Sequence, residues 1–362
     1  MADSGTSLVL PFVNFTRLKT SNCVAALTPE ELLELKGNLE ASAEQFYLLL
    51  CPIAIGLGTL ASLVGVAYFC VVSYGLWRRL LPAKPTVYLL HRTVADLMTN
   101  ATAIALGAYL LVARHTGNAF LFSNVVMAVL LWFFYGSAVA SIVTYSGLSR
   151  LKMLAVAKPL YYRVTATVRN CLVRIAVTWT VCLVIAGCEF GYMLFHILKY
   201  DEGPILCYDS AECAAMQRSL YKVMAAAFLA GYLSVFAFFA VTCVAILLHN
   251  RGRNRERIEG RANRANNEFP NRLFLGIVPF AIGYLPFLAL LANFGFTIET
   301  CESTRRYRQL YLAYPFGLLF VVVKNLCDPL LDFSVDPRLR EAARGLLRRN
   351  ARADFDSLRS ST

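Results

Sequence analysis

The chain has 362 residues, 57% of them hydrophobic and 16% charged, and its mean hydropathy is +0.54. Soluble proteins contain about 45–50% apolar residues, so this composition excludes an ordinary soluble protein and indicates a membrane protein. The net charge of +12 does not indicate a nucleic-acid partner, because most Lys and Arg residues follow apolar segments, where they set topology and contact anionic lipid.

Apolar windows long enough to cross a membrane, for which a helix needs about 20 residues, occur seven times along the chain. In chain order they cover residues 46–76, 86–112, 121–150, 171–195, 220–248, 272–297 and 309–333. We therefore predict an all-α membrane protein, folded as a seven-transmembrane helix bundle.

Positively charged residues set the expected orientation. Lys and Arg cluster after the first, third and fifth windows and in the C-terminal segment, and such loops face the cytoplasm. The protein is then a multi-pass protein of the plasma membrane with an extracellular N-terminus. Asn14-Phe15-Thr16 matches the acceptor for N-glycosylation, which agrees with this orientation.

Four of the 11 Cys residues lie on the predicted outer side, where disulfides form: Cys23, Cys207, Cys213 and Cys301. Four cysteines allow three pairings, and the sequence alone does not choose among them. Our working expectation is a short Cys207–Cys213 loop and a Cys23–Cys301 bond between the N-terminal segment and the last outer loop.

The last window carries charges inside an apolar stretch, VVVKNLCDPLLDF over residues 321–333. A charged side chain in the bilayer centre costs about 2.5–3.5 kcal/mol on insertion scales. Lys324, Asp328 and Asp332 therefore need partners inside the bundle. Asp96, in the middle of the second window, is a further buried carboxylate.

Short motifs along the chain have the order and spacing of one receptor family. VADL contains Asp96, Trp179 lies in the fourth window, GYLP covers 283–286 and DPLLD covers 328–332. Over residues 45–345 the chain resembles the rhodopsin-like (class A) G protein-coupled receptors. The resemblance adds a short amphipathic eighth helix after the bundle. It implies an extracellular N-terminal segment over 1–44, the seven-transmembrane domain over 45–333, helix eight over 334–347 and a cytoplasmic tail over 348–362.

The chain departs from the family pattern at positions that matter for signalling. Lys152 stands where the family has the Arg of Asp-Arg-Tyr, and Tyr284 stands where helix six has a Trp. Asp328 and Asp332 replace the Asn and Tyr of NPxxY. No Cys lies near the outer end of the third window, so the family's disulfide to the second outer loop cannot form.

Relatives hold a sodium ion between the helix-two Asp, a helix-three Ser and helix seven. Here Asp96 and Ser141 occupy the first two positions, and Lys324 lies one helical turn from Asp328. A buried cation next to two carboxylates compensates them, whereas each charge alone would be expelled or neutralised. We hypothesise that the Lys324 ammonium takes the place of sodium in this internal charge network.

The resemblance also implies an activation switch, in which helix six moves outward and opens a crevice for a heterotrimeric G protein. The expected switch residues are Ile142, Phe280, Tyr284, Pro286 and Pro329. Lys152 and Arg340 are expected to contact the G protein. An arrestin and membrane lipid are further expected partners.

An extracellular ligand is expected between the outer ends of the helices, in a pocket lined by Phe134, Tyr135, Glu189, Tyr284, Phe287, Leu291 and Tyr314. Phe134 stands where amine receptors have an Asp, which disfavours a monoamine. Arg305, Arg306 and Arg308 at the start of the last window favour a peptide with an acidic end, and a lipid acid is the second choice.

Other function classes remain open. A transporter or channel would use Asp96, Lys324 and Asp328 as an ion path, but the sequence contains no repeated half. A retinal photoreceptor would place its Lys at Val322 rather than Lys324. The chain contains no HExxH, GxSxG or P-loop motif and only four scattered His residues, so we expect no enzyme activity, no cofactor and no metal site.

Overall fold

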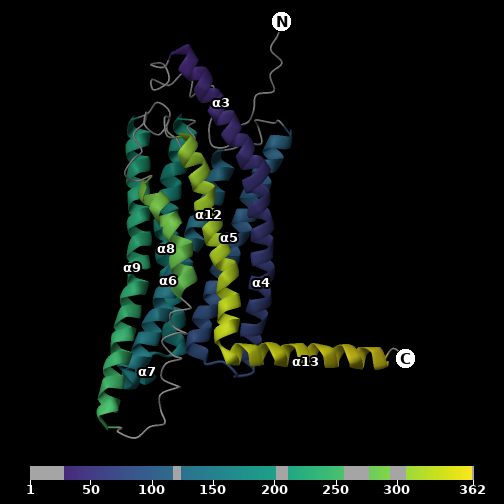
Figure 1. Ribbon diagram of the computed structural model, residues 1–362, viewed down its shortest axis with the longest axis vertical. Helices are drawn as coiled ribbons and strands as arrows, with labels where there is room; N and C mark the ends of the chain where they lie inside the picture. The colour runs from purple at the N-terminus through teal and green to yellow at the C-terminus, as the bar shows by residue number, and fades with distance from the viewer. Residues whose placement is uncertain (1–27, 117–123, 201–210, 257–276, 294–306, 361–362) are drawn as a thin grey trace.

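The computed structural model describes residues 28–116, 124–200, 211–256, 277–293 and 307–360, and every regular element in these ranges is a helix. The long helices stand side by side as a bundle (Figure 1). They are α4 (Cys51–Trp77), α5 (Ala83–Thr116), α6 (Asn124–Ala157), α8 (Val168–Tyr200), α9 (Ala211–Glu256), an apolar helix over Ile277–Asn293, here called helix six, and α12 (Tyr307–Val335). The predicted seven-helix bundle is therefore confirmed.

The helices differ in how plainly their composition marks them as membrane spans. By length and apolarity, four described stretches can cross a membrane: Tyr47–Trp77, Ala83–His115, Val125–Ala157 and Tyr221–Leu248. Helix six is apolar but shorter in its described part. α12 has 29 residues, which is long enough to cross a membrane. The Lys and Asp residues of the charged window lower its apolarity.

The main cluster of buried apolar side chains reaches from α4 to α12. α6 lies at its centre, because it contacts α5, α8 and α9. Phe134 and Ile142 of α6 and Phe280 of helix six are almost completely buried in this cluster. Three of the residues predicted to form the switch, Ile142, Phe280 and Tyr284, lie in this cluster.

The C-terminal helix α13 (Pro337–Ser360) turns sideways at the end of α12 and runs out from the bundle (Figure 1). Asp336 marks the corner: its Oδ1 accepts a hydrogen bond of 2.9 Å from the backbone N–H of Arg338, and Pro337 suits the first turn of a helix. Leu339 and Ala342 are buried, and Leu339 packs on Tyr68 and Val72 of α4.

α13 is longer than the helix eight expected over 334–347. It continues to Ser360, so the segment 348–360, expected as a tail, is helical in the structure. The reason is visible in the sequence LLRRNARADFDSLRS, which follows Gly345 and contains no further Gly or Pro to end the helix.

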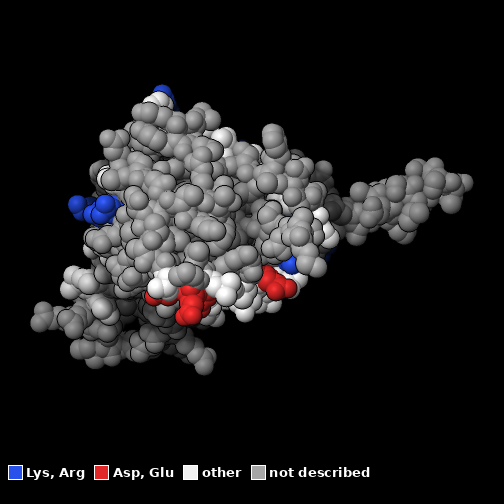
Figure 2. All heavy atoms as spheres, turned by 90° about the horizontal axis from the view of Figure 1, so that it is seen from above, with Lys and Arg blue, Asp and Glu red and all other residues white. Residues whose placement is uncertain are grey.

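At the opposite end of the bundle, α3 (Pro29–Gln45) continues through a π-helical turn, η1 (Phe46–Leu50), into α4. Viewed from this end, acidic side chains gather along one edge of the molecule (Figure 2). The exposed acidic residues of α3 whose side chains are described are Glu30, Glu31, Glu34 and Glu44. This end of the molecule therefore differs in charge from the end that carries the Arg-rich α13.

Candidate functional site

The site is built from one face of α5 and one face of α12. Side chains at every fourth position of a helix share a face. Here they are Arg92, Asp96 and Asn100 on α5 and Lys324, Asp328 and Asp332 on α12. All are buried except Asp332, whose side chain is 25% exposed. The two polar faces meet inside the bundle, so each supplies partners for the other.

Lys324 is the centre of the network. Its Nζ lies 3.0 Å from Asp96 Oδ1 and 3.2 Å from Asp328 Oδ2, and it donates to Asn325 Oδ1 at 2.9 Å. Ser141 donates to Asp96 Oδ1 at 2.8 Å and is 3.3 Å from Lys324 Nζ. The structure thus brings together the four residues of the expected charge network, with the ammonium between both carboxylates.

Two tyrosines extend the network toward α6 and helix six. The Tyr145 hydroxyl donates to Asp328 Oδ2, and the Lys324 ammonium lies 5.1 Å from the centre of the Tyr145 ring. The Tyr284 hydroxyl is 3.4 Å from Lys324 Nζ, and its ring centre is 4.9 Å away. Both rings therefore place electron-rich faces and a hydroxyl near the buried cation.

A second ion pair lies one layer closer to α13. Arg92 Nη2 bonds to Asp332 Oδ2, and the Tyr68 hydroxyl donates to the same oxygen at 2.7 Å. The guanidinium carbon is 5.3 Å from the centre of the Tyr145 ring. Arg92 Nε is 3.9 Å from Asp96 Oδ2, so Arg92 stands between the two ion-pair layers.

Sequence reasoning missed Arg92, Tyr68, Tyr145 and Asn325. Arg92 carried a readable signal, since it precedes Asp96 by four residues in an apolar window and a charge there needs a partner. The tyrosines carried none, because Tyr is common in membrane helices and its hydroxyl partner depends on how the helices pack.

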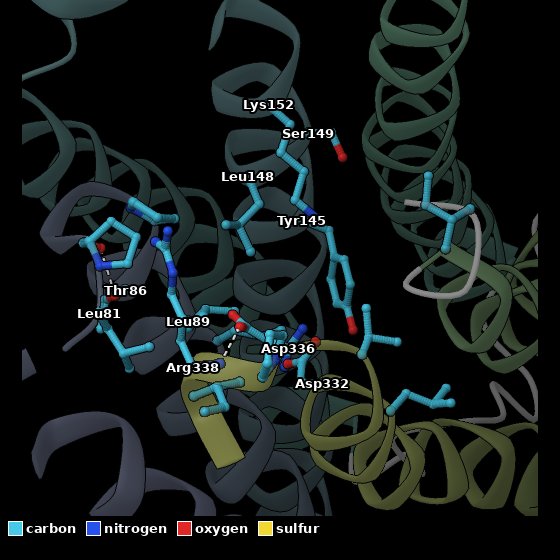
Figure 3. A pocket seen from close by; sticks show the side chains of 18 of the residues that line it. Leu81, Thr86, Leu89, Tyr145, Leu148, Ser149, Lys152, Asp332, Asp336 and Arg338 are labelled. Carbon is cyan, nitrogen blue, oxygen red and sulfur yellow. Dashed lines mark hydrogen bonds and ion pairs between the residues drawn. The ribbon is translucent and has the colours of Figure 1, made fainter. Parts of the chain in front are cut away.

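Below the Arg92–Asp332 pair, the helices enclose a cavity of about 580 Å³ at the α13 end. Its walls are largely apolar, with Leu89, Leu148 and Ile277 among the lining residues. Figure 3 looks into it: Tyr145, Ser149 and Lys152 come from α6, while Asp332 and Asp336 come from the α12 end. Lys152, which stands in place of the family's Arg, is exposed here and has no hydrogen bond or ion pair among the described residues.

Arg340, the other expected G-protein contact, hydrogen-bonds to the last turn of α12 in this structure. Its Nη1 donates to the backbone carbonyls of Ser334 at 2.6 Å and Phe333 at 3.3 Å. These carbonyls end α12, where a cation is favourable. In this conformation Arg340 fastens α13 to the last turn of α12.

The aromatic residues expected to line the ligand pocket pack against one another. The Phe287 ring centre is 5.9 Å from that of Phe134 and 5.7 Å from that of Tyr135, and Leu291 belongs to the same cluster. These residues and Tyr284 are at least nine-tenths buried, so they present little free surface. Glu189 lies in α8 and Tyr314 in α12, but their side chains fall outside the described part.

Two of the predicted switch residues, Phe280 and Tyr284, are in ring contact in the same region. Phe280 stacks on Tyr232 of α9 at 5.3 Å and lies 4.7 Å from Tyr145 and 5.3 Å from Tyr284, measured between ring centres. Ile142 is part of the same core cluster. Pro286 lies in helix six, and Pro329 is a buried residue of α12, next to Asp328.

Several expected residues cannot be placed. Asn14, Cys23, Cys207 and Cys301 lie outside the described residues, and Cys213 lies in the first turn of α9 without a described side chain. The disulfide and glycosylation expectations therefore stay predictions. Among the described residues, no group of three or more His, Cys, Asp or Glu side chains is placed to hold a metal ion.

Comparison with known proteins agrees with this architecture. Residues 69–331 match the family described as 7 transmembrane receptor (rhodopsin family). No curated protein matches the sequence. The matched segment covers most of the chain and runs from α4 to the last turns of α12, across both polar faces of the network. The chain belongs to the rhodopsin family of seven-transmembrane receptors.

Proposed function

We propose that this receptor lies in the plasma membrane with its N-terminal segment outside and activates heterotrimeric G proteins through the cavity at the α13 end. The observation that carries the proposal is the cavity itself. Its volume of about 580 Å³ lies in the range of about 300–1,000 Å³ typical of binding pockets, and it opens where α5, α6, α12 and α13 meet.

The charges of the cavity favour a partner with a carboxylate. Asp332 is already paired with Arg92, and Asp336 caps α13. Lys152 makes no hydrogen bond or ion pair among the described residues, so its ammonium can contact an incoming anion, although it shares the cavity with Asp332 and Asp336. An ammonium acts as a compact point charge, so a single carboxylate suits it better than the bidentate contact an Arg would make.

Exposed apolar side chains at the same end of the bundle as the cavity favour a protein partner over a small ligand alone. The short helix α7 (Pro159–Thr165) follows α6 at the same end of the bundle (Figure 1). Leu160 and Val164 lie one turn apart on it and are 79% and 77% exposed. These two side chains add apolar surface at the cavity end of the bundle, which a protein partner in the cavity could cover.

Activation follows as a population shift. A ligand at the α3 end that repacks Phe134 and Phe287 would change the contacts of helix six and favour the state in which its α13 end moves outward. Pro286 allows a bend there, because proline removes one backbone hydrogen bond of the helix.

The pairing of the buried charges with one another argues against a continuous ion path, and so against a transporter.

For the ligand we infer a peptide first and a lipid acid second. The acidic side chains of α3, Glu30, Glu31 and Glu34, are exposed at the end where a ligand would arrive, and they suit a peptide that also carries basic residues. Arg305 and Arg306 lie outside the described residues. Arrestin binding to the C-terminal segment, through phosphorylation of Ser357, Ser360, Ser361 and Thr362, belongs to the same proposal.

The test is a panel of G-protein activation sensors in cells, first without ligand and then with a peptide library. Lys152→Ala should lower the signal, whereas Arg150→Ala, an exposed neighbour outside the cavity wall, should not. Equal signals from wild type and Lys152→Ala at matched surface levels would refute the role of Lys152. A wild-type protein that reaches the surface but activates no sensor under either condition would contradict G-protein coupling.

A further inference from the structure

A very small cavity lies between α4, α5 and α12, beside the charge network. Its volume is about 10 Å³, close to the minimum of about 10–15 Å³ that a single water molecule requires. Its polar lining residues are Arg92, Thr93, Asp96, Asn100 and Asn325. All five are buried, so whatever satisfies their polar atoms must come from inside the bundle.

One wall of this cavity carries an unsatisfied donor. The Arg92 side chain is only 6% exposed, and its Nε has no hydrogen-bond acceptor among the described residues. The other end of the guanidinium is held by Asp332, which fixes the direction of Nε. A buried N–H without an acceptor costs about 1–3 kcal/mol, and more in a charged group, so native proteins rarely leave one unpaired.

The opposite walls offer an acceptor and a second donor. Asp96 uses Oδ1 for Ser141 and Lys324, while its Oδ2 faces Arg92 Nε at 3.9 Å, too far for a direct hydrogen bond. Asn100 accepts a 2.8 Å hydrogen bond from Asn325 through Oδ1, which leaves its Nδ2 donor without a partner among the described residues.

We propose that this cavity binds one structural water molecule, which accepts hydrogen bonds from Arg92 Nε and Asn100 Nδ2 and donates one to Asp96 Oδ2. The site matches water in volume, in polarity and in the count of about three hydrogen bonds that buried waters make. Two hydrogen bonds of about 2.8 Å, bent at the water oxygen, span the 3.9 Å between Nε and Oδ2.

The same walls reject a monovalent cation. A cation needs acceptors on every side, but Arg92 Nε and Asn100 Nδ2 present N–H donors to this cavity, and the first belongs to a guanidinium. The Asp96 carboxylate already has the Lys324 ammonium at 3.0 Å. A neutral molecule that both donates and accepts is therefore the class of ligand that the site takes.

The position of this water gives it a structural role. Asp96 belongs to the Lys324 layer and Arg92 to the Asp332 layer, and no direct hydrogen bond joins the two among the described residues. The water adds a hydrogen-bonded connection to the 3.9 Å ion pair of Arg92 Nε and Asp96 Oδ2 that already joins them. A movement of α12 that shifts the Asp332 carboxylate would shift the Arg92 guanidinium. The water would then transmit this displacement to Asp96.

The deciding experiment is a structure of the full-length receptor in lipid nanodiscs at about 2 Å resolution or better, once with sodium chloride and once with the sodium replaced by caesium. We expect an isolated density peak within hydrogen-bond distance of Arg92 Nε and Asp96 Oδ2, with the same height in both salts. Absence of the peak would overturn the proposal. So would a peak that strengthens in caesium, which would identify a cation site.

A matched pair of variants on α4 provides a second readout. Ala61 lines the polar cavity, whereas Ala54 lines a separate apolar cavity of about 40 Å³. Ala61→Val should expel the water, remove the density peak and lower the melting temperature, because it leaves Arg92 Nε unpaired. Ala54→Val should not lower the melting temperature. Because crowding at Ala61 would also reduce stability, the density decides: a peak that stays in Ala61→Val overturns the proposed position.

Discussion

Lys324 Nζ and Asp96 Oδ1 lie 3.0 Å apart in the interior of the bundle, although 228 residues separate them in the chain. Asp328 completes the arrangement from the other side at 3.2 Å. A charge is tolerated in this apolar environment because its partners are equally buried and because Ser141, Asn325 and Tyr284 supply further polar contacts. The charged residues of α12 are therefore an internal network rather than a surface feature.

Removing the cation should be more damaging than removing the whole charged cluster. Lys324→Met leaves Asp96 and Asp328 close together and uncompensated, which we expect to cost about 3–5 kcal/mol. The triple variant with Asp96→Asn and Asp328→Asn has no buried charge left at this position and should recover much of the loss. Thermal unfolding of the purified protein measures both. A triple variant less stable than Lys324→Met would contradict compensation as the reason for the cluster.

Sodium should have little effect on the wild-type protein. If the Lys324 ammonium occupies the place of sodium, replacing sodium chloride with N-methylglucamine chloride at constant ionic strength should leave the melting temperature unchanged. Lys324→Ala opens space next to two carboxylates and should make the melting temperature rise with sodium. The hypothesis fails if wild type depends strongly on sodium, if Lys324→Ala keeps this dependence and if Asp96→Asn abolishes it.

Sequence patterns identified the helices and part of the network for a physical reason. In a membrane each spanning segment must satisfy its backbone hydrogen bonds within the segment, as a helix does. A spanning helix can therefore be predicted from its own stretch of sequence. Lys324 and Asp328 share one helix at a spacing of four, and that pairing is readable as well. Arg92 and Asp332 lie on different helices, 240 residues apart, so their contact depends on which faces α5 and α12 turn toward each other.

The extent of α13 and the packing of the aromatic residues could not be read in the same way. Family resemblance implied a short helix eight. The sequence after Gly345 contains no Gly or Pro to end the helix, so α13 continues to Ser360. Phe134 and Phe287, which we expect to line the ligand pocket, pack on each other in this structure. Whether large aromatic residues line a space or fill it depends on distances between helices, which residue types do not specify.

The Arg92–Asp332 pair should respond unequally to loss of its two members. Arg92→Met leaves Asp332 with the Tyr68 hydroxyl and access to the cavity, since its side chain is 25% exposed. Asp332→Leu instead leaves a guanidinium that is only 6% exposed without its main partner. We therefore expect Asp332→Leu to lower the free energy of unfolding more than Arg92→Met, by about 1–3 kcal/mol.

The double variant Arg92→Met/Asp332→Leu serves as the control for this comparison. Because it removes both charges, it should be more stable than Asp332→Leu alone, and the interaction energy from the four proteins measures their coupling. Chemical or thermal unfolding in the same detergent gives all four values. Additive losses, with no recovery in the double variant, would show that the pair does not act as a unit.

Gly283 allows helix six to approach α12 at the level of the network. A Cβ atom at this position would overlap Lys324 Cβ and lie 2.8 Å from Lys324 Cγ and 3.3 Å from the Phe320 carbonyl oxygen. Gly283→Ala must therefore push helix six and α12 apart or displace Lys324 from its carboxylates. We expect a loss of about 1–3 kcal/mol, the usual cost of overpacking, measured by thermal unfolding.

Gly187 on α8 offers the matched control, since nothing lies within 4 Å of a Cβ added there. Gly187→Ala should be neutral or stabilising by up to about 1 kcal/mol, because Ala has the higher helix propensity. The two identical substitutions then differ only in what the new methyl group meets. If Gly283→Ala proved as stable as Gly187→Ala, the close approach of helix six to Lys324 would not be a constraint on the fold.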